Sequence, residues 1–183
     1  MNIAHYQDVL DFWFDPEHAD LLFEKNDDFD TLIQERFGDT LIAACEGLLW
    51  DWRTSAYGRL AEIIVLDQFS RNLYRGDKKS FAQDTMALTL AQELYNLREF
   101  KDDFSTQEQS FAMMPFMHSE SRDIHEIALR IFSEIGDENT LHYEKLHKDI
   151  IDRFGRYPHR NEILGRKTTE EEDAFLKEPN SSF

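Results

Sequence analysis

The sequence predicts an all-α protein: antiparallel helices joined by short loops, about eight to ten in number. Apolar residues recur at the helical period through nearly every segment, and no segment alternates apolar and polar residues over the length of a strand. Glycine or proline stands at many of the points where these periodic segments end, as expected for helix ends and tight connections. We therefore expect a single helical domain over residues 1–178, followed by a frayed tail at 179–183.

Capping and breaking residues predict where the helices begin and end. Ser105 and Glu108 have the spacing of a capping box, and Pro115 should kink or end the helix that follows, just before His118. Gly38, Gly76, Gly136 and Gly155 are expected to end helices. The expected helices, in chain order, are Tyr6–Phe14, Phe29–Phe37, Asp39–Trp50, Ser55–Arg75, Phe81–Phe100, Ser105–Met117, Ile124–Ile135, Thr140–Phe154 and a short one capped by Thr168 or Thr169.

Composition excludes several classes of function. The net charge of −17 argues against a nucleic-acid binder and against docking on anionic lipid, because both need a basic surface. Cys45 is the single cysteine, which excludes an internal disulfide and a metal–thiolate cluster. The first residues lack the features of a secretory signal, and no apolar run is long enough for a membrane span. We expect a soluble, cytoplasmic protein.

The stretch Leu60–Gly76, LAEIIVLDQFSRNLYRG, is the segment around which the other helices are expected to pack. Its first half is apolar on nearly every side, as in a buried helix, yet its second half carries charged and amide groups on one side. An unpaired buried charge costs several kcal/mol, so other polar groups must meet this helix. We predict that Asp67 is buried and bonded to at least one arginine, such as Arg71 one turn away.

A basic block stands out near the end of this acidic chain. Residues His147–Lys167 carry six Lys or Arg against three Asp or Glu, and arginine is the usual donor to carboxylate or phosphate. We expect the FGRYPHRN loop within this block to pack back on the central helix. Two interpretations of its arginines stay open: an anion site, or internal ion pairs with acids such as Asp67, Asp84 and Glu120.

Several residues are candidates for a functional site. The segment after Pro115 could aim side chains into a cleft, and His147 lies on the inner stripe of its helix. The candidate acid–base groups are His118, Glu120 and His147. The candidate ligand-binding groups are Asp67, Arg71, Asn72, Arg153, Arg156, His159 and Arg160.

Metal and cofactor sites are not expected. The histidines match no standard ligand spacing such as HExxH, and there is no GxSxG, P-loop or GxGxxG motif. Cys45 and the tryptophans Trp13, Trp50 and Trp52 are interpreted as core residues.

The blocks VLDFWF, LDQFSRNLYRG, FAQD, MPFMHSES, HKDIIDRFGRYPHRNEILGR and TTEEEDAFL occur in the order of one bacterial family. Nearly the whole chain resembles the domain of unknown function 924 family. This resemblance implies a tetratricopeptide-like, all-α fold, but it assigns no reaction. The chain departs from the usual family pattern at Ser70, where that pattern has proline, and at Leu22, where it has tryptophan. Neither change removes a charged group.

Two functions are compatible with the sequence. In the first, the candidate residues line one polar pocket that binds a small anionic molecule, and a histidine acts as an acid–base group with its tautomer fixed by a carboxylate. In the second, the polar blocks are only structural, and a helix-lined groove binds a peptide. Exposed tryptophans would favour the second function or a homo-oligomer contact.

Overall fold

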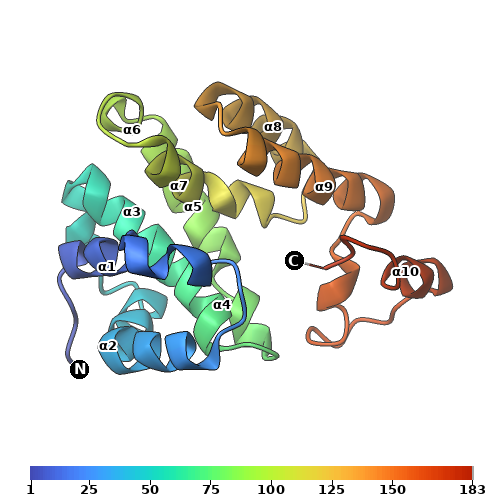
Figure 1. The fold of residues 1–183 in the computed structure, drawn as a ribbon, viewed down its shortest axis with the longest axis horizontal. Helices are drawn as coiled ribbons and strands as arrows, with labels where there is room; N and C mark the ends of the chain where they lie inside the picture. Colours follow the sequence, from blue (N-terminus) through green and yellow to red (C-terminus); the bar gives the residue numbers. More distant parts are fainter. Residues whose placement is uncertain (183) are drawn as a thin grey trace. The chain divides into compact units, whose positions relative to one another are not determined.

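The computed structural model describes residues 1–182, and within this range it has ten α-helices and no strand (Figure 1). The chain forms two compact units, Met1–Phe104 and a second that begins at Ser105. The first unit holds α1 Tyr6–Trp13, α2 Asp27–Cys45, α3 Ala56–Ile64, α4 Ser70–Leu73, α5 Asp84–Tyr95 and α6 Arg98–Asp102, and the second holds α7 Thr106–Met117, α8 Arg122–Ile135, α9 Glu138–Phe154 and α10 Glu170–Phe175. The all-α class is confirmed. The single domain and the tetratricopeptide-like array of antiparallel helical hairpins stay predictions.

The first unit is built around the predicted central helix. The Ser55 hydroxyl accepts the N–H of Gly58 and caps α3. Helix α3 continues through a π-helical turn at Val65–Phe69 into α4, so the predicted helix is confirmed except in its last turn. The Phe69 ring lies 5.6 Å from that of Trp13 and 5.3 Å from that of Phe37, measured between centroids. These aromatic contacts place the central helix in the core of its unit.

Other boundaries and positions in the first unit also differ from prediction, including Gly76, since α4 already ends at Leu73. Gly38 does not end a helix: α2 runs unbroken from Asp27 to Cys45. A glycine in a helix costs only about 1 kcal/mol, and the fully buried Phe37 and Leu41 on either side outweigh that cost by packing. The predicted helix Phe81–Phe100 is divided, because Leu97 is extended between α5 and α6. Trp50 is also not a core residue, since its side chain is exposed.

In the second unit, local signals set the helix ends as predicted. Ser105 and Glu108 form a capping box at the start of α7, and α7 ends at Met117, two residues after Pro115. Gly136 and Gly155 adopt the left-handed conformation that ends α8 and α9, with φ of 79° and 70°. Short 3₁₀ helices lie at Pro16–Leu21, Trp50–Thr54, Lys78–Phe81 and Pro158–Arg160. In the described part of the chain no helix is long and apolar enough to cross a membrane.

Candidate functional site

The predicted ligand-binding residues of the central helix form ion pairs within the first unit. Asp67 is fully buried, and its Oδ1 accepts a hydrogen bond from Arg71 Nη1 at 3.0 Å. The same Nη1 lies 2.9 Å from Asp84 Oδ1, and Arg71 Nη2 lies 3.1 Å from Asp84 Oδ2. Arg71 thus bridges the buried carboxylate of the central helix to the first residue of α5. The prediction that Asp67 is buried and bonded to an arginine is confirmed.

Asn72 takes part in a second polar contact of the first unit. Its Nδ2 donates to Asp30 Oδ1 at 2.7 Å, and Arg75 Nε donates to Asp30 Oδ2 at 2.6 Å. Asp30 lies on α2, so this contact ties the end of the central helix to α2, as the Arg71 bridge ties it to α5. Both contacts stabilise the packing of the unit.

The end of α7 is the point where polar side chains gather in the second unit. Three successive carbonyl oxygens there each accept a hydrogen bond from another segment. Tyr157 Oη donates to the oxygen of Met117 at 2.5 Å, Arg160 Nη2 to that of His118 at 3.1 Å, and His125 Nε2 to that of Ser119 at 2.8 Å. The last carbonyls of a helix lack partners within it. These three side chains therefore complete the hydrogen bonding of the end of α7.

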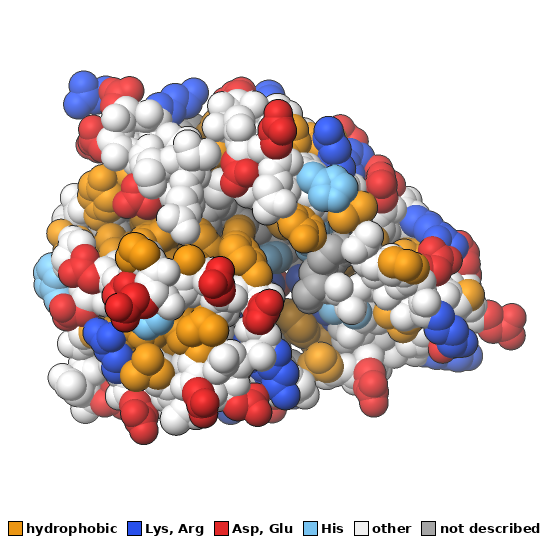
Figure 2. Space-filling view, in the orientation of Figure 1, with side chains coloured by type: hydrophobic (Ala, Val, Ile, Leu, Met, Phe, Trp, Pro, Cys, Tyr) orange, Lys and Arg blue, Asp and Glu red, His pale blue; other side chains and the backbone are white. Residues whose placement is uncertain are grey.

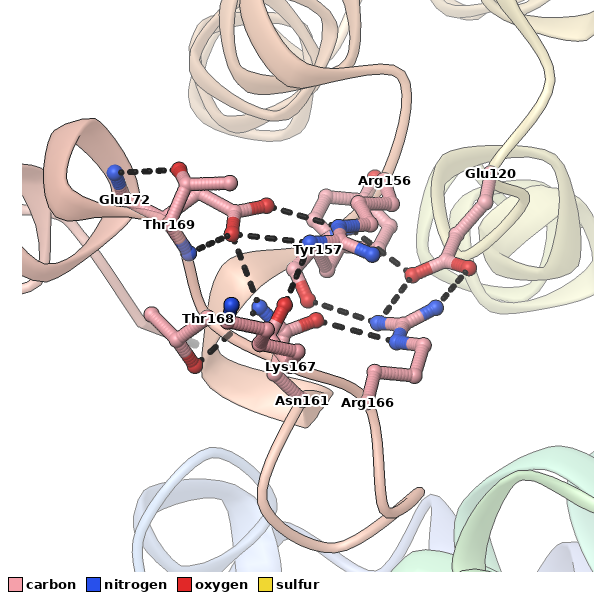
Figure 3. A network of polar contacts seen from close by, with 9 residues as sticks. All are labelled: Glu120, Arg156, Tyr157, Asn161, Arg166, Lys167, Thr168, Thr169 and Glu172. Carbon is pink, nitrogen blue, oxygen red and sulfur yellow. Dashed lines mark hydrogen bonds and ion pairs between the residues drawn. The ribbon is translucent and has the colours of Figure 1, made fainter.

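Glu120, the next residue, is held by the loop that follows α9 (Figure 3). Its carboxylate accepts the Tyr157 N–H at 2.8 Å and two bonds from the Arg166 guanidinium, at 2.7 and 3.0 Å. Burial raises the pKa of Glu120, but the bonds from Arg166 and Tyr157 outweigh it and keep the pKa below its ordinary value. Glu120 is thus an ionised anchor for the loop, with the geometry of a brace more than of a catalytic acid.

Two of the predicted anion-binding arginines are engaged with acids of the α10 region. Arg156 binds Glu172 through Nε and Nη2, at 2.6 and 2.8 Å, and Arg153 Nε lies 3.0 Å from Glu171 Oε1. Arg156 lowers the pKa of Glu172 to about 2. Figure 3 shows that the Glu172 carboxylate also accepts a hydrogen bond from the backbone N–H of Thr169. Thr169 and Glu172 thus form a capping box at the start of α10, where a cap by Thr168 or Thr169 was predicted. These two arginines of the basic block are thus paired with carboxylates, and their role as ligand-binding residues stays a prediction.

A buried histidine–glutamate pair lies behind the end of α7. His125 and Glu144 are both fully buried, and His125 Nδ1 lies 2.7 Å from Glu144 Oε1. Because His125 Nε2 donates to the Ser119 carbonyl, the Nδ1 contact needs one more proton, carried by either the carboxyl group or the imidazole. Burial raises the pKa of Glu144, while the contact with His125 opposes that rise. The pair therefore holds one proton between two buried groups.

His147 is the candidate acid–base residue with the most perturbed environment. Its Nδ1 lies 2.8 Å from the Tyr143 carbonyl oxygen, which fixes the Nδ1–H tautomer and leaves the lone pair on Nε2. Burial lowers its pKa to about 3, the Tyr143 bond opposes this, and His118, His125 and His159 lower it further. His147 is therefore neutral at physiological pH, with a hydrogen-bond acceptor at Nε2.

The ring of Tyr157 lies at the centre of these groups. The histidine rings of His125, His147 and His159 have centroids 6.3, 5.7 and 5.5 Å from it. The Arg160 guanidinium carbon lies 4.6 Å from the same centroid. We call His118, His125, Glu144, His147, Tyr157, His159 and Arg160 the Tyr157 cluster.

The sequence did not identify three members of the Tyr157 cluster. Tyr157, His125 and Glu144 were not among the candidate site residues. His125 and Glu144 lie on different helices, α8 and α9, so no spacing motif connects them. A signal was present: each lies three residues before a buried position, Ala128 and His147, and thus on an inner helix stripe. A carboxylate and an imidazole on facing inner stripes are candidates for a pair.

The predicted site residues fall in both units. Asp67, Arg71 and Asn72 belong to the first, whereas His118, Glu120, His147, Arg153, Arg156, His159 and Arg160 belong to the second. A single pocket lined by all of them, and the packing of the FGRYPHRN loop on the central helix, stay predictions. Across residues 1–182, no group of three or more His, Cys, Asp or Glu side chains is placed to hold a metal ion.

Comparisons with known proteins agree with this fold. The model of the family described as bacterial protein of unknown function (DUF924) matches residues 9–180. A solved structure of a protein of unknown function, ATU0120 from Agrobacterium tumefaciens, is 35% identical and superposes with a TM-score of 0.88, over 94% of this chain and 96% of that one. A comparison with curated proteins gave no match. The chain therefore belongs to the bacterial DUF924 family, whose members are proteins of unknown function.

Proposed function

We propose that the chain binds a small anionic molecule at the Tyr157 cluster, where histidines serve as acid–base groups. The observation that carries this proposal is the gathering of three imidazoles and the Arg160 guanidinium around one tyrosine ring. Arginine and imidazole N–H groups are the usual donors to carboxylate and phosphate oxygens.

The acid–base roles follow from the hydrogen bonds. His147 is neutral at physiological pH and carries its lone pair on Nε2, where it can accept a hydrogen bond from a ligand. The carboxylate expected beside His118 or His147 is found beside His125, where Glu144 orients the imidazole. A carboxylate that fixes a histidine tautomer is a common element of general acid–base sites. In this proposal neutral His147 is a hydrogen-bond acceptor for the ligand, and the one proton held by His125 and Glu144 is the acidic proton of the site.

A thermal-shift titration tests this proposal. The probes are inorganic phosphate, pyrophosphate and citrate, each compared with sodium chloride at equal ionic strength. A bound anion at a hundred times its Kd stabilises by about 2.7 kcal/mol, which raises the Tm of a chain of this size by about 5–10 °C. The response should be lost in Arg160→Gln and His159→Asn, and kept in Arg153→Gln, whose arginine is paired with Glu171 outside the cluster.

Circular dichroism of each variant checks that its helices remain. If no probe raises the Tm beyond chloride, the proposal is wrong. It is also wrong if Arg160→Gln and His159→Asn both respond as fully as the parent.

The second candidate function is a tetratricopeptide-like interaction module that binds a peptide. It is favoured by the ion pairs that Arg153, Arg156 and Arg166 form with carboxylates, because arginines paired in this way can be purely structural. It is also favoured by the exposure of Trp50. A cytoplasmic location is part of both proposals.

A further inference from the structure

The C-terminal end of α2 reverses in a way that brings apolar side chains together. Gly47 has φ of 74°, the N–H of Gly47 bonds to the Ala44 carbonyl at 3.0 Å, and the N–H of Leu48 bonds to the Ala43 carbonyl at 2.9 Å. This pair of bonds defines a Schellman motif. A hydrophobic contact between the residue after the glycine and the last turn of the helix frequently accompanies this motif, and Leu48 and Ile42 occupy these two positions.

Large apolar side chains at this end of α2 remain exposed. Ile42 is 42% exposed, Leu48 51% and Trp50 62%. Figure 2 shows hydrophobic side chains at the surface over α1 and α2, with acidic side chains among them. We call Ile42, Leu48 and Trp50 the α2-end surface. The three residues are close in the chain, at the end of α2 and the start of the 3₁₀ helix Trp50–Thr54. Exposed tryptophan is typical of the centre of a binding surface.

Acidic side chains border the α2-end surface. Asp39, Ile42 and Glu46 follow one another at helical spacing on one exposed face of α2, and the exposed Asp51 comes directly after Trp50. In the described part of the chain, Glu46 and Asp51 form no ion pair. The carboxylates of Glu46 and Asp51 are therefore available to positively charged groups of a partner.

The helix itself adds to this preference. The end of a helix carries a partial negative charge, which cations stabilise. Helix α2 has no basic residue in its last turn, and its C-cap is the acidic Glu46. The residues of α2 thus supply no positive charge at this helix end, and a partner can supply that charge.

We infer that the α2-end surface docks a basic amphipathic peptide segment, with a bulky apolar side chain against Trp50 and Leu48 and with Lys or Arg beside Glu46 and Asp51. A second copy of this chain is a poorer occupant, because it would bring its own acids and its net charge of −17 to the same surface. This inference is independent of the proposed anion site, since the surface lies in the first unit and the Tyr157 cluster in the second. Either can fail without the other.

Fluorescence anisotropy tests the inference with the full chain. The probe is a labelled helical peptide of leucine on one face and lysine on the other, and the control peptide has glutamate in place of each lysine. We expect saturable binding of the lysine peptide only. Trp50→Ala should weaken it at least about tenfold, as expected for an interface tryptophan. The double variant Glu46→Gln, Asp51→Asn should weaken it and reduce its dependence on salt.

Phe23→Ala is the matched control. Phe23 is 73% exposed but precedes the N-terminus of α2, so its removal should leave binding unchanged. Equal binding of the lysine peptide by the parent and Trp50→Ala would mean attraction by overall charge only, and would overturn the inference. No saturable binding of the lysine peptide, or equal binding of the glutamate peptide, would also overturn it. Sedimentation of a dimer that Trp50→Ala dissociates would assign the surface to a second copy instead.

Discussion

Acidification should destabilise the protein through His147. The imidazole is 6% exposed, donates through Nδ1 to Tyr143 and is neutral in the folded state, with its pKa lowered to about 3. In the unfolded chain the same group titrates at about 6.5. Between pH 3 and pH 6.5, the imidazole is therefore protonated in the unfolded state and neutral in the folded state.

The sign and size of the effect follow from linkage. Because the folded pKa is depressed, stability is fully present above about pH 6.5 and is lost as the pH falls toward 3. A proton bound only by the unfolded state changes the free energy of unfolding by about 1.4 kcal/mol per pH unit. Between pH 7 and pH 4.5, His147 alone should lower the free energy of unfolding by about 2.5 kcal/mol.

The assay is urea unfolding at a series of pH values, with the parent compared to His147→Asn. Asparagine keeps a donor for the Tyr143 carbonyl and does not titrate. Other groups, such as Glu144 with its raised pKa, are present in both proteins and largely cancel in the difference. His142→Asn is the control, because His142 is exposed on the same helix. Parallel pH profiles of the parent and His147→Asn would refute the reasoning.

Two further predictions concern the first unit, and denaturant unfolding measures both. Asp67→Ala should cost about 1.5–3 kcal/mol, because it removes the buried carboxylate that Arg71 and Gln68 bond, while Arg71 keeps its two bonds to Asp84. A loss below about 1 kcal/mol would show that the pair behaves as a surface one. Gly58→Ala should cost about 1–3 kcal/mol or more, since its Cβ would lie 2.0 Å from the Trp52 carbonyl oxygen, where only glycine fits. Gly38→Ala is the matched control: its Cβ would meet only the end of a flexible glutamine side chain, so the better helix former should be neutral or stabilising. Equal losses at the two glycines would contradict the steric argument.

The residues that set helix ends could be read from the sequence because their effect is local. Ser105 caps α7 with its own hydroxyl, and Gly155 ends α9 by adopting a positive φ that other residues avoid. Pro115 leaves the Phe111 carbonyl without its helical hydrogen bond, and α7 ends two residues after it, at Met117. Such signals depend on neighbours a few residues away, and each was placed correctly.

The buried charge of Asp67 was also predictable, because its partner Arg71 lies one turn along the same helix. The partners from other segments were not. Arg71 reaches Asp84, thirteen residues on, and His125 meets Glu144, nineteen residues on and on another helix. The spacing within each helix shows which side chains face inward, but it does not show which residues of two different helices meet.

The sequence alone determined that the chain is helical, where most helices end and that a charge lies in the core. Tertiary structure alone decided which carboxylates the arginines meet, that Tyr157 is the centre of the histidine cluster and that Trp50 is exposed. The reason is physical: helix formation and capping depend on interactions within a turn or two. Burial and ion pairing depend on which helix faces meet, and the packing of the whole unit sets those contacts.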